Sequence, residues 1–336
     1  MIHRTASPWQ TPEWQNVLRD AFTETDELFD YLELDRRQLP MAAAGFGLKV
    51  PRGFAAQIEK GNPQDPILRQ ILPIEDELTP QPGFNRDPVG DQFTEVVPGV
   101  LHKYHGRILL LVGGACGINC RYCFRRHYPY NNSHADHHQW RYALGYLQNN
   151  HEISEVILSG GDPLILSDHR LAELIKLLEK VPHLRRLRIH SRLPVIVPQR
   201  LTPELIHLLS GSRLHSTLVV HINHSAEISD EFSRGAAQLK TRGVTLLNQS
   251  VLLRGINDNS ELLAGLSEKL FECGVLPYYL HLLDRVEGAA HFEVEISRAV
   301  KLHDTLRQRL PGYLLPRLVR ETSGEKSKSP VTSRHC

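Results

Sequence analysis

The sequence has no apolar run that approaches the roughly 20 residues needed to span a bilayer. Its first residues, from Met1 to Pro8, lack the apolar core of a secretory signal. Lysine and arginine (39) balance aspartate and glutamate (38), so no excess of positive charge is available for nucleic acid or a membrane surface. We therefore expect a cytoplasmic protein with no membrane or nucleic-acid partner.

Cysteine is scarce, with five residues in a chain of 336, and an odd number does not suit a disulfide framework. Three of the five, Cys116, Cys120 and Cys123, are crowded into one short segment. A chain of this length buries a sizeable core without disulfides or structural metals. Thiols this close together in a cytosolic protein are typical of metal or cluster ligands, and we interpret these three in that way.

The sequence also lacks internal repeats and low-complexity tracts, but its composition changes near residue 105. The apolar spacing from Trp14 to Leu34 predicts helices, and residues 60–100, rich in Pro, Gly and Asp, predict turns and short elements. From about residue 107, apolar strands alternate with helical patterns, which is typical of parallel strands buried on both faces. The expected strands are 108–112, 155–158, 184–189, 216–221, 244–253 and 277–283, and the expected helices include 171–180, 203–209, 230–242 and 260–273.

Six strand–helix units favour an α/β fold, namely a partial (β/α)6 barrel of the TIM type. Polar residues gather at the C-terminal ends of the strands, where such barrels carry their chemistry. We therefore divide the chain into a mainly helical N-terminal region (1–105), the barrel (106–310) and a C-terminal tail (311–336).

The three cysteines form a C-x3-C-x2-C loop directly after the first barrel strand. Three thiolates hold three irons of a [4Fe-4S] cubane, which leaves the fourth iron open to chelate a cofactor. The pattern resembles the signature of the radical S-adenosylmethionine (SAM) superfamily. The alternative is a zinc site, for which His127 would be the fourth ligand.

The segment Ser159–Leu164, which contains Gly160, Gly161 and Asp162, ends the second strand. It resembles the superfamily element that binds the SAM amino group, since glycine permits close backbone approach. Taken alone, it reads equally well as a Gly-Gly-Asp-Pro turn.

A longer series of motifs follows in one order along the chain. It consists of His102–Leu111, the cysteine loop, Ser159–Leu164, Ser191–Val195, His221–His224, Asn248–Asn257, Pro277–Leu280, Asp284 and Lys328–Val331. This series resembles the lysine 2,3-aminomutase family. The short chain resembles the branch of that family that makes (R)-β-lysine from free L-lysine, which a separate ligase then attaches to elongation factor P.

The resemblance implies a [4Fe-4S] cluster, SAM and pyridoxal 5′-phosphate (PLP) as cofactors, together with a reductant protein as partner. Matching the Lys-Ser-Pro pattern makes Lys328 the lysine that carries PLP, and places this function in the tail. Lys326 is the competing candidate. Lys103 and Arg107 match positions that hold the PLP phosphate, and Gln249 at a strand end fits a contact to SAM or PLP.

Substrate recognition is also implied by the resemblance. Arg125 matches the residue that pairs with the substrate carboxylate, while Asp284 and Glu321 match the acids that receive the ε-ammonium group. The chain departs from the fermentative enzymes, which have Asp at the position of Glu321 and a Gly-rich run before the PLP lysine. This departure concerns substrate tightness and turnover rather than reaction type.

Two other hypotheses remain at this stage. One is a radical aminomutase for a different amino acid, although two acids at the distal end argue against glutamate. The other is a non-catalytic iron–sulfur or zinc binding module. A histidine-rich patch, formed by His134, His137 and His138, reads as a solvated loop or a metal site.

Overall fold

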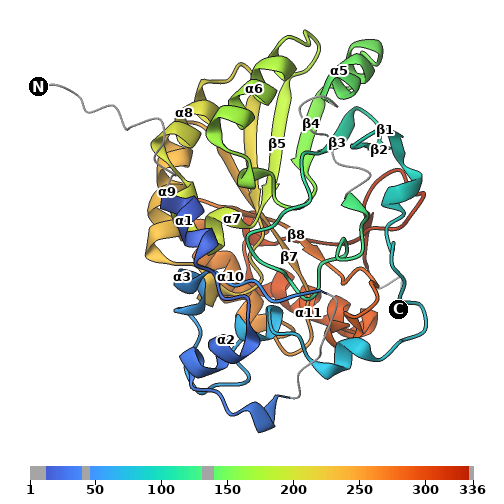
Figure 1. Cartoon of the computed structure of the whole chain (residues 1–336). Coiled ribbons are helices and arrows are strands. Elements are labelled where there is room, and N and C mark those ends of the chain that lie inside the picture. Colours follow the sequence, from blue (N-terminus) through green and yellow to red (C-terminus); the bar gives the residue numbers. More distant parts are fainter. Residues whose placement is uncertain (1–12, 40–45, 131–139, 333–336) are drawn as a thin grey trace, which may run out of the picture.

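The computed structural model describes residues 13–39, 46–130 and 140–332 (Figure 1). In these residues one sheet of ten strands follows the chain order, and β3 to β8 are parallel neighbours. The predicted (β/α) barrel is confirmed, and each predicted strand overlaps an observed one. The strands are β1 (Glu95–Val97), β2 (Val100–Tyr104), β3 (Arg107–Leu111), β4 (Glu155–Ser159), β5 (Arg186–Ser191), β6 (His215–Val220), β7 (Thr245–Val251), β8 (Leu276–His281), β9 (Arg317–Arg320) and β10 (Ser329–Pro330).

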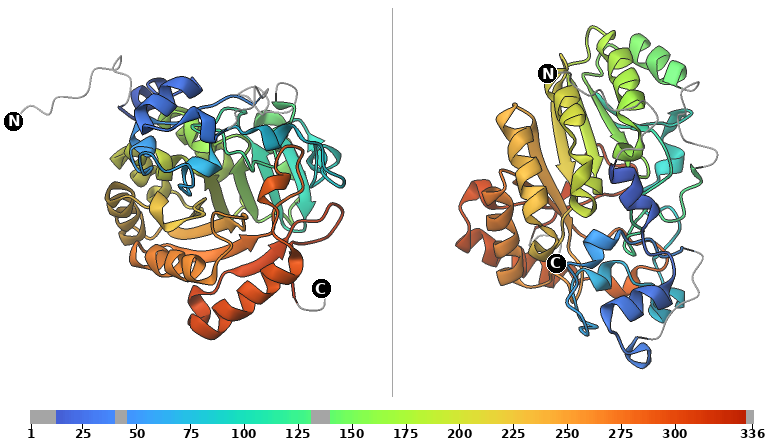
Figure 2. Two further views of the ribbon diagram at one scale, coloured as in Figure 1. Left: turned by 90° about the horizontal axis from the view of Figure 1, so that it is seen from below. Right: turned by 60° about the vertical axis from the view of Figure 1, so that its left-hand side comes forward.

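Helices follow the parallel strands and cover the outer face of the curved sheet (Figure 2). The four helices predicted between residues 171 and 273 are confirmed as α6, α8, α9 and α10, whereas α5 and α11 escaped prediction. In α11 the buried residues Ala299, Val300, His303 and Leu306 recur at helical spacing, although His303 is polar. The α-helices are α1 (Glu13–Arg19), α2 (Thr25–Leu32), α3 (Arg52–Ala55), α5 (Trp140–Asn149), α6 (Asp168–Glu179), α7 (Leu193–Ile196), α8 (Pro203–Gly211), α9 (Asp230–Thr241), α10 (Ser260–Glu272) and α11 (Ile296–Arg309).

Local sequence explains where these helices begin. Ser167, Thr202 and Ser229 each accept a hydrogen bond from a backbone N–H of the first turn of α6, α8 and α9. Such caps satisfy donors that a helix leaves unpaired at its start. In α6 the apolar residues then recur on one face, so the helix buries that face against the sheet.

The C-terminal tail continues the sheet. The strand β9 pairs in parallel with β8, and β10 returns antiparallel to β9 with Ser329 opposite Arg320. At the other edge, β2 pairs antiparallel with both β1 and β3. The three regions expected from the sequence therefore share one sheet.

The N-terminal region contains the predicted helices α1 and α2, followed by short elements. Its apolar residues, among them Trp14 and Phe54, belong to the same buried cluster as Val156 and Leu187 of the barrel. No helix in the described part of the chain is long and apolar enough to cross a membrane. The predicted histidine-rich patch lies outside the described residues.

Candidate active site

A cavity of about 580 Å³ lies at the C-terminal ends of the parallel strands. Strand-end loops, the cysteine loop and the C-terminal hairpin all contribute to its wall. It is lined by all the residues that the family resemblance assigned to the cluster, the other cofactors or the substrate. These residues are Lys103, Arg107, Cys116, Cys120, Cys123, Arg125, Gly160, Gly161, Asp162, Gln249, Asp284, Glu321 and Lys328.

The cysteine loop is fastened to the N-terminal region by buried ion pairs. Arg121, which is fully buried, donates from Nε and Nη2 to the two carboxylate oxygens of Glu77 at 2.7 and 2.5 Å. Arg126 donates to the same carboxylate at 2.6 Å. The backbone N–H of Arg121 also donates to the carbonyl of Gln70 at 2.9 Å. These contacts fix the conformation of the loop.

The three cysteines are free and half-buried. Burial raises the pKa of the Cys123 thiol to about 11, so ligation must displace a proton. Among the described residues no three His, Cys, Asp or Glu side chains are grouped around one ion position. A cubane does not need such a group, because each cysteine binds a different iron.

The zinc alternative required His127. The His127 ring instead contacts the carbonyl of Glu287, with Nε2 at 3.2 Å from the oxygen, and does not line the cavity.

Gly160 and Gly161 bring the end of β4 against the cysteine loop. Gly160 has a φ of +120°, which favours glycine. A Cβ atom on Gly161 would lie 2.3 Å from the carbonyl oxygen of Ala115. Only glycine permits this approach, which leaves bare backbone next to the cysteines.

The Asp162 carboxylate serves the fold around this turn. It accepts hydrogen bonds from Ser191 Oγ at 2.7 Å and from the backbone N–H groups of Leu164, Arg192 and Leu193 at 2.8–3.0 Å. These four donors tie the end of β4 to the start of α7. The carboxylate of Asp162 is therefore already occupied. If Asp162 contacts SAM, as the sequence predicts, it would do so through its backbone.

A chain of charges runs along one wall. Arg125 Nε donates to Asp91 at 2.7 Å, and Lys103 Nζ lies 2.5 Å from the other oxygen of the same carboxylate. Lys103 also donates to Glu321 at 3.1 Å, and Lys328 donates to the second oxygen of Glu321 at 2.6 Å. Three cations thus alternate with two anions, which leaves this wall with one excess positive charge.

The ionisation of this wall follows from burial and pairing. Burial alone would raise the pKa of Asp91 and Glu321, but the neighbouring cations hold both values below their usual range. Asp284, three residues beyond β8, makes no such pair. Burial, followed by the charge of Glu321, raises the pKa of Asp284 to about 7.

The C-terminal hairpin explains the spacing of Glu321 and Lys328. Glu321 directly follows β9 and Lys328 directly precedes β10, so the two side chains meet where the paired strands part. Lys326 is exposed and does not line the cavity. The position of Lys328 therefore favours it over Lys326 as the lysine at the site.

Several buried polar atoms of the cavity wall have no hydrogen-bond partner among the described residues. They are Oε1 of Gln249 and Nε2 of His190, His221 and His281. Burial lowers the pKa of His221 to about 3, so its ring is neutral at pH 7. Unpaired buried groups of this kind are costly unless a ligand satisfies them, so the wall fits a large polar ligand.

Sequence reasoning missed Asp91, which holds Arg125 and Lys103 from the short helix η4 (Asp91–Phe93). It also assigned no role to Arg192, which lies within the matching segment Ser191–Val195. The residues that Asp91 and Arg192 contact are remote from them in sequence, and no local sequence pattern predicts these contacts.

Known proteins resemble this chain in sequence and in fold. A profile described as the radical SAM superfamily matches residues 110–262. The L-lysine 2,3-aminomutase of Escherichia coli (strain K12) is 49% identical over 95% of this chain and 94% of its own length. That of Clostridium subterminale is 33% identical over 96% of this chain and 78% of its own length.

Among solved structures, Streptococcus suis SuiB bound to S-adenosylmethionine has a TM-score of 0.50 and 15% identity, over 65% of this chain and 51% of that chain. This likeness concerns the fold alone. Radical SAM enzymes use a [4Fe-4S] cluster and SAM, and lysine 2,3-aminomutases also depend on PLP. The chain belongs to the radical SAM lysine 2,3-aminomutase family, whose members are isomerases.

Proposed function

We propose that this protein converts L-α-lysine to (R)-β-lysine, an intramolecular transfer of the amino group. The observation that carries the proposal is a single cavity that joins the three-cysteine loop, a lysine on the C-terminal hairpin and carboxylates of Asp284 and Glu321. When bound, the cluster and SAM would supply a 5′-deoxyadenosyl radical, and PLP would stabilise a migrating radical rather than a carbanion.

The chain's own residues divide the cofactors along the cavity. Cys116, Cys120 and Cys123 would hold the cluster beside the bare backbone of Gly160 and Gly161. The ε-amino group of Lys328 would carry PLP, and the cations of Lys103 and Arg107 would face its phosphate. Gln249 offers an unpaired oxygen to either small molecule.

Arg125 is placed to take the substrate carboxylate. Its Nε bonds Asp91 and its Nη1 donates to Ser159 Oγ at 2.9 Å, while Nη2 has no partner among the described residues. A guanidinium held in this way keeps donors for a carboxylate without losing side-chain entropy.

The substrate ε-ammonium group belongs with Asp284 and Glu321. Glu321 already binds an ammonium group, that of Lys328, so its surroundings accept such a cation. If Lys328 carried PLP, the Glu321 oxygen that now accepts from Lys328 would be available to the substrate ammonium group, while the other oxygen would stay with Lys103. Two acids at this end favour lysine and disfavour glutamate, which would bring a like charge.

The proposal extends to cellular context. By resemblance, we place the reaction in the cytoplasm, with an electron-donor protein as reductant and with elongation factor P and its ligase as users of the product. To test that link, this protein is combined with the purified ligase and elongation factor P, so that it is the source of β-lysine. The mass of the factor then shows whether it has been modified. An unmodified factor, with free β-lysine present, contradicts it.

Anaerobic turnover tests the function itself. The reconstituted protein should contain about four irons and four sulfides per chain. With lysine, SAM, PLP and dithionite it should form β-lysine, identified by chromatography on a chiral phase, and Cys123→Ala should form none. Absence of the cluster contradicts the proposal. Lysine is tested in a panel of amino acids, and failure of lysine to give product also contradicts it.

A further inference from the structure

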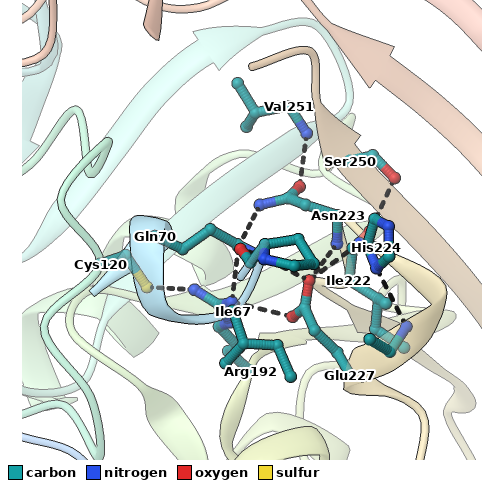
Figure 3. A network of polar contacts seen from close by, with 12 residues as sticks. Ile67, Gln70, Cys120, Arg192, Ile222, Asn223, His224, Glu227, Ser250 and Val251 are labelled. Carbon is teal, nitrogen blue, oxygen red and sulfur yellow. Dashed lines mark hydrogen bonds and ion pairs between the residues drawn. The ribbon is translucent and has the colours of Figure 1, made fainter. Parts of the chain in front are cut away.

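Arg192, the residue after β5, connects one cysteine to a buried polar network (Figure 3). Its side chain is only 5% exposed. Nη1 donates to Cys120 Sγ and to Tyr122 Oη, each at 2.7 Å. Nη2 donates to Gln70 Oε1 and to Glu227 Oε2, each at 2.8 Å. One guanidinium thus joins a cysteine of the loop to a buried acid.

Glu227 is itself held by the fold. It is fully buried, and its Oε1 accepts from the backbone N–H groups of Asn223 and His224, each at 2.9 Å. Gln70 donates to the same oxygen at 3.1 Å. Asn223 in turn accepts from the N–H of Val251 at the end of β7 at 2.8 Å. The guanidinium therefore cannot turn away from the sulfur without breaking contacts to several segments.

Among the described residues, Cys120 is the one cysteine of the loop whose sulfur receives a hydrogen bond from a charged side chain. Lys49, by contrast, donates to the backbone carbonyl of Cys116 rather than to its sulfur. Hydrogen bonds to cluster sulfurs and nearby charge set the reduction potential of an iron–sulfur cluster, because both stabilise the added electron.

We propose that Arg192 is a positioning residue that, through its hydrogen bond to the Cys120 sulfur, makes the bound cluster easier to reduce. In the reduction the cluster gains one electron, and the donor, dithionite in the assay, is oxidised. The guanidinium stays charged throughout and gives up no proton. Glu227 and Gln70 keep it on the sulfur, so the N-terminal region also contributes to the electron affinity of the site.

This inference rests on the cluster binding that the proposed function requires. The test compares wild type with Arg192→Gln, which removes the charge, and Arg192→Lys, which keeps it but loses the planar fork. Arg200→Lys is the matched control, because Arg200 is fully buried and binds the carbonyl of Leu164 rather than a sulfur. All variants are reconstituted and assayed for iron and sulfide.

The midpoint potential is measured without SAM, by a dithionite titration followed by electron paramagnetic resonance. At a fixed potential, Arg192→Gln should show about a tenfold lower ratio of reduced to oxidised cluster, which is 59 mV for one electron. Arg192→Lys should fall between, and Arg200→Lys should match wild type.

Unchanged potentials in both Arg192 variants with a full cluster would overturn the inference and leave the proposed function intact. Loss of the cluster from Arg192→Lys would also overturn it, because the role would then be structural. Failure of the wild-type chain to hold a cluster contradicts the proposed function instead.

Discussion

Asp284 gives the site a pH dependence that can be worked out from its surroundings. Its pKa rises from the usual 3.8 to about 7, because the group is buried and lies near Glu321. At 1.36 kcal/mol per pH unit, that rise corresponds to about 4 kcal/mol against the ionised carboxylate in the empty site. The ε-ammonium group of lysine must offset this free energy when it binds.

The sign follows from the direction of the pKa. Below pH 7 the empty site holds Asp284 protonated, so binding of an ammonium group must expel a proton. Affinity for lysine is therefore weak at pH 6, rises through pH 7 and levels off near pH 8. With a pKa near 7, the gain from pH 6 to pH 8 is about tenfold.

Norleucine provides the matched ligand, because it keeps the carboxylate and the α-amino group of lysine but has no ε-ammonium group. The assay measures KM for lysine and the inhibition constant of norleucine between pH 5.5 and 8.5. In wild type, KM for lysine divided by the inhibition constant of norleucine should fall about tenfold between pH 6 and pH 8. In Asp284→Asn the ratio should be flat, and KM at pH 8 should rise on the order of 30-fold, for the loss of about 2 kcal/mol of pairing.

A pH-independent ratio in wild type, or an equal pH dependence in Asp284→Asn, would refute the assignment of Asp284 to the ammonium group. The visible spectrum of the cluster and of PLP should be the same in both proteins. It therefore reports whether the substitution has disturbed more than the intended contact.

Three other predictions concern the remaining walls of the cavity. Borohydride reduction in the presence of PLP should label Lys328, and Lys328→Ala but not Lys326→Ala should abolish the label in peptide mass analysis; labelling of Lys326 would contradict the geometry. Asp91→Asn should lower the free energy of unfolding by about 3 kcal/mol or more, because Arg125 and Lys103 lose their shared carboxylate, and a denaturant titration that matches wild type would disprove this role. Gly161→Ala should lower the iron content after reconstitution, because its Cβ would meet the backbone of the cysteine loop, whereas Gly145→Ala, with open space around it, should not.

The sequence was most informative where the residues of a motif lie close together along the chain. The spacing of the three cysteines and the Lys-Ser-Pro match at Lys328 needed no three-dimensional information. The barrel was equally accessible, because buried parallel strands such as β4 read as apolar runs. Helix α11 was not predicted, although its buried residues recur at helical spacing; one of them, His303, is polar.

The charged wall was not accessible in this way. Arg125 donates a hydrogen bond to Asp91 across a separation of 34 residues in the sequence. Lys103 donates to Glu321 across a separation of 218 residues. Side chains from such distant positions meet only because the edges of the sheet curve around one cavity. The sequence therefore pointed to Arg125, Lys103 and Glu321, but neither to Asp91 between them nor to the sharing of Glu321 by two lysines.

The position of β9 and β10 has a consequence for biosynthesis. Glu321 and Lys328 are the last of the site residues to be translated, and both depend on the pairing of β9 with β8. A nascent chain that has emerged only as far as α11 already contains the cysteine loop and the glycine turn. The order of synthesis thus delays Lys328, the lysine proposed to carry PLP, until the rest of the barrel is available to fold. A chain interrupted before β9 would keep the parts for radical generation but lack the residues proposed to direct that radical to lysine.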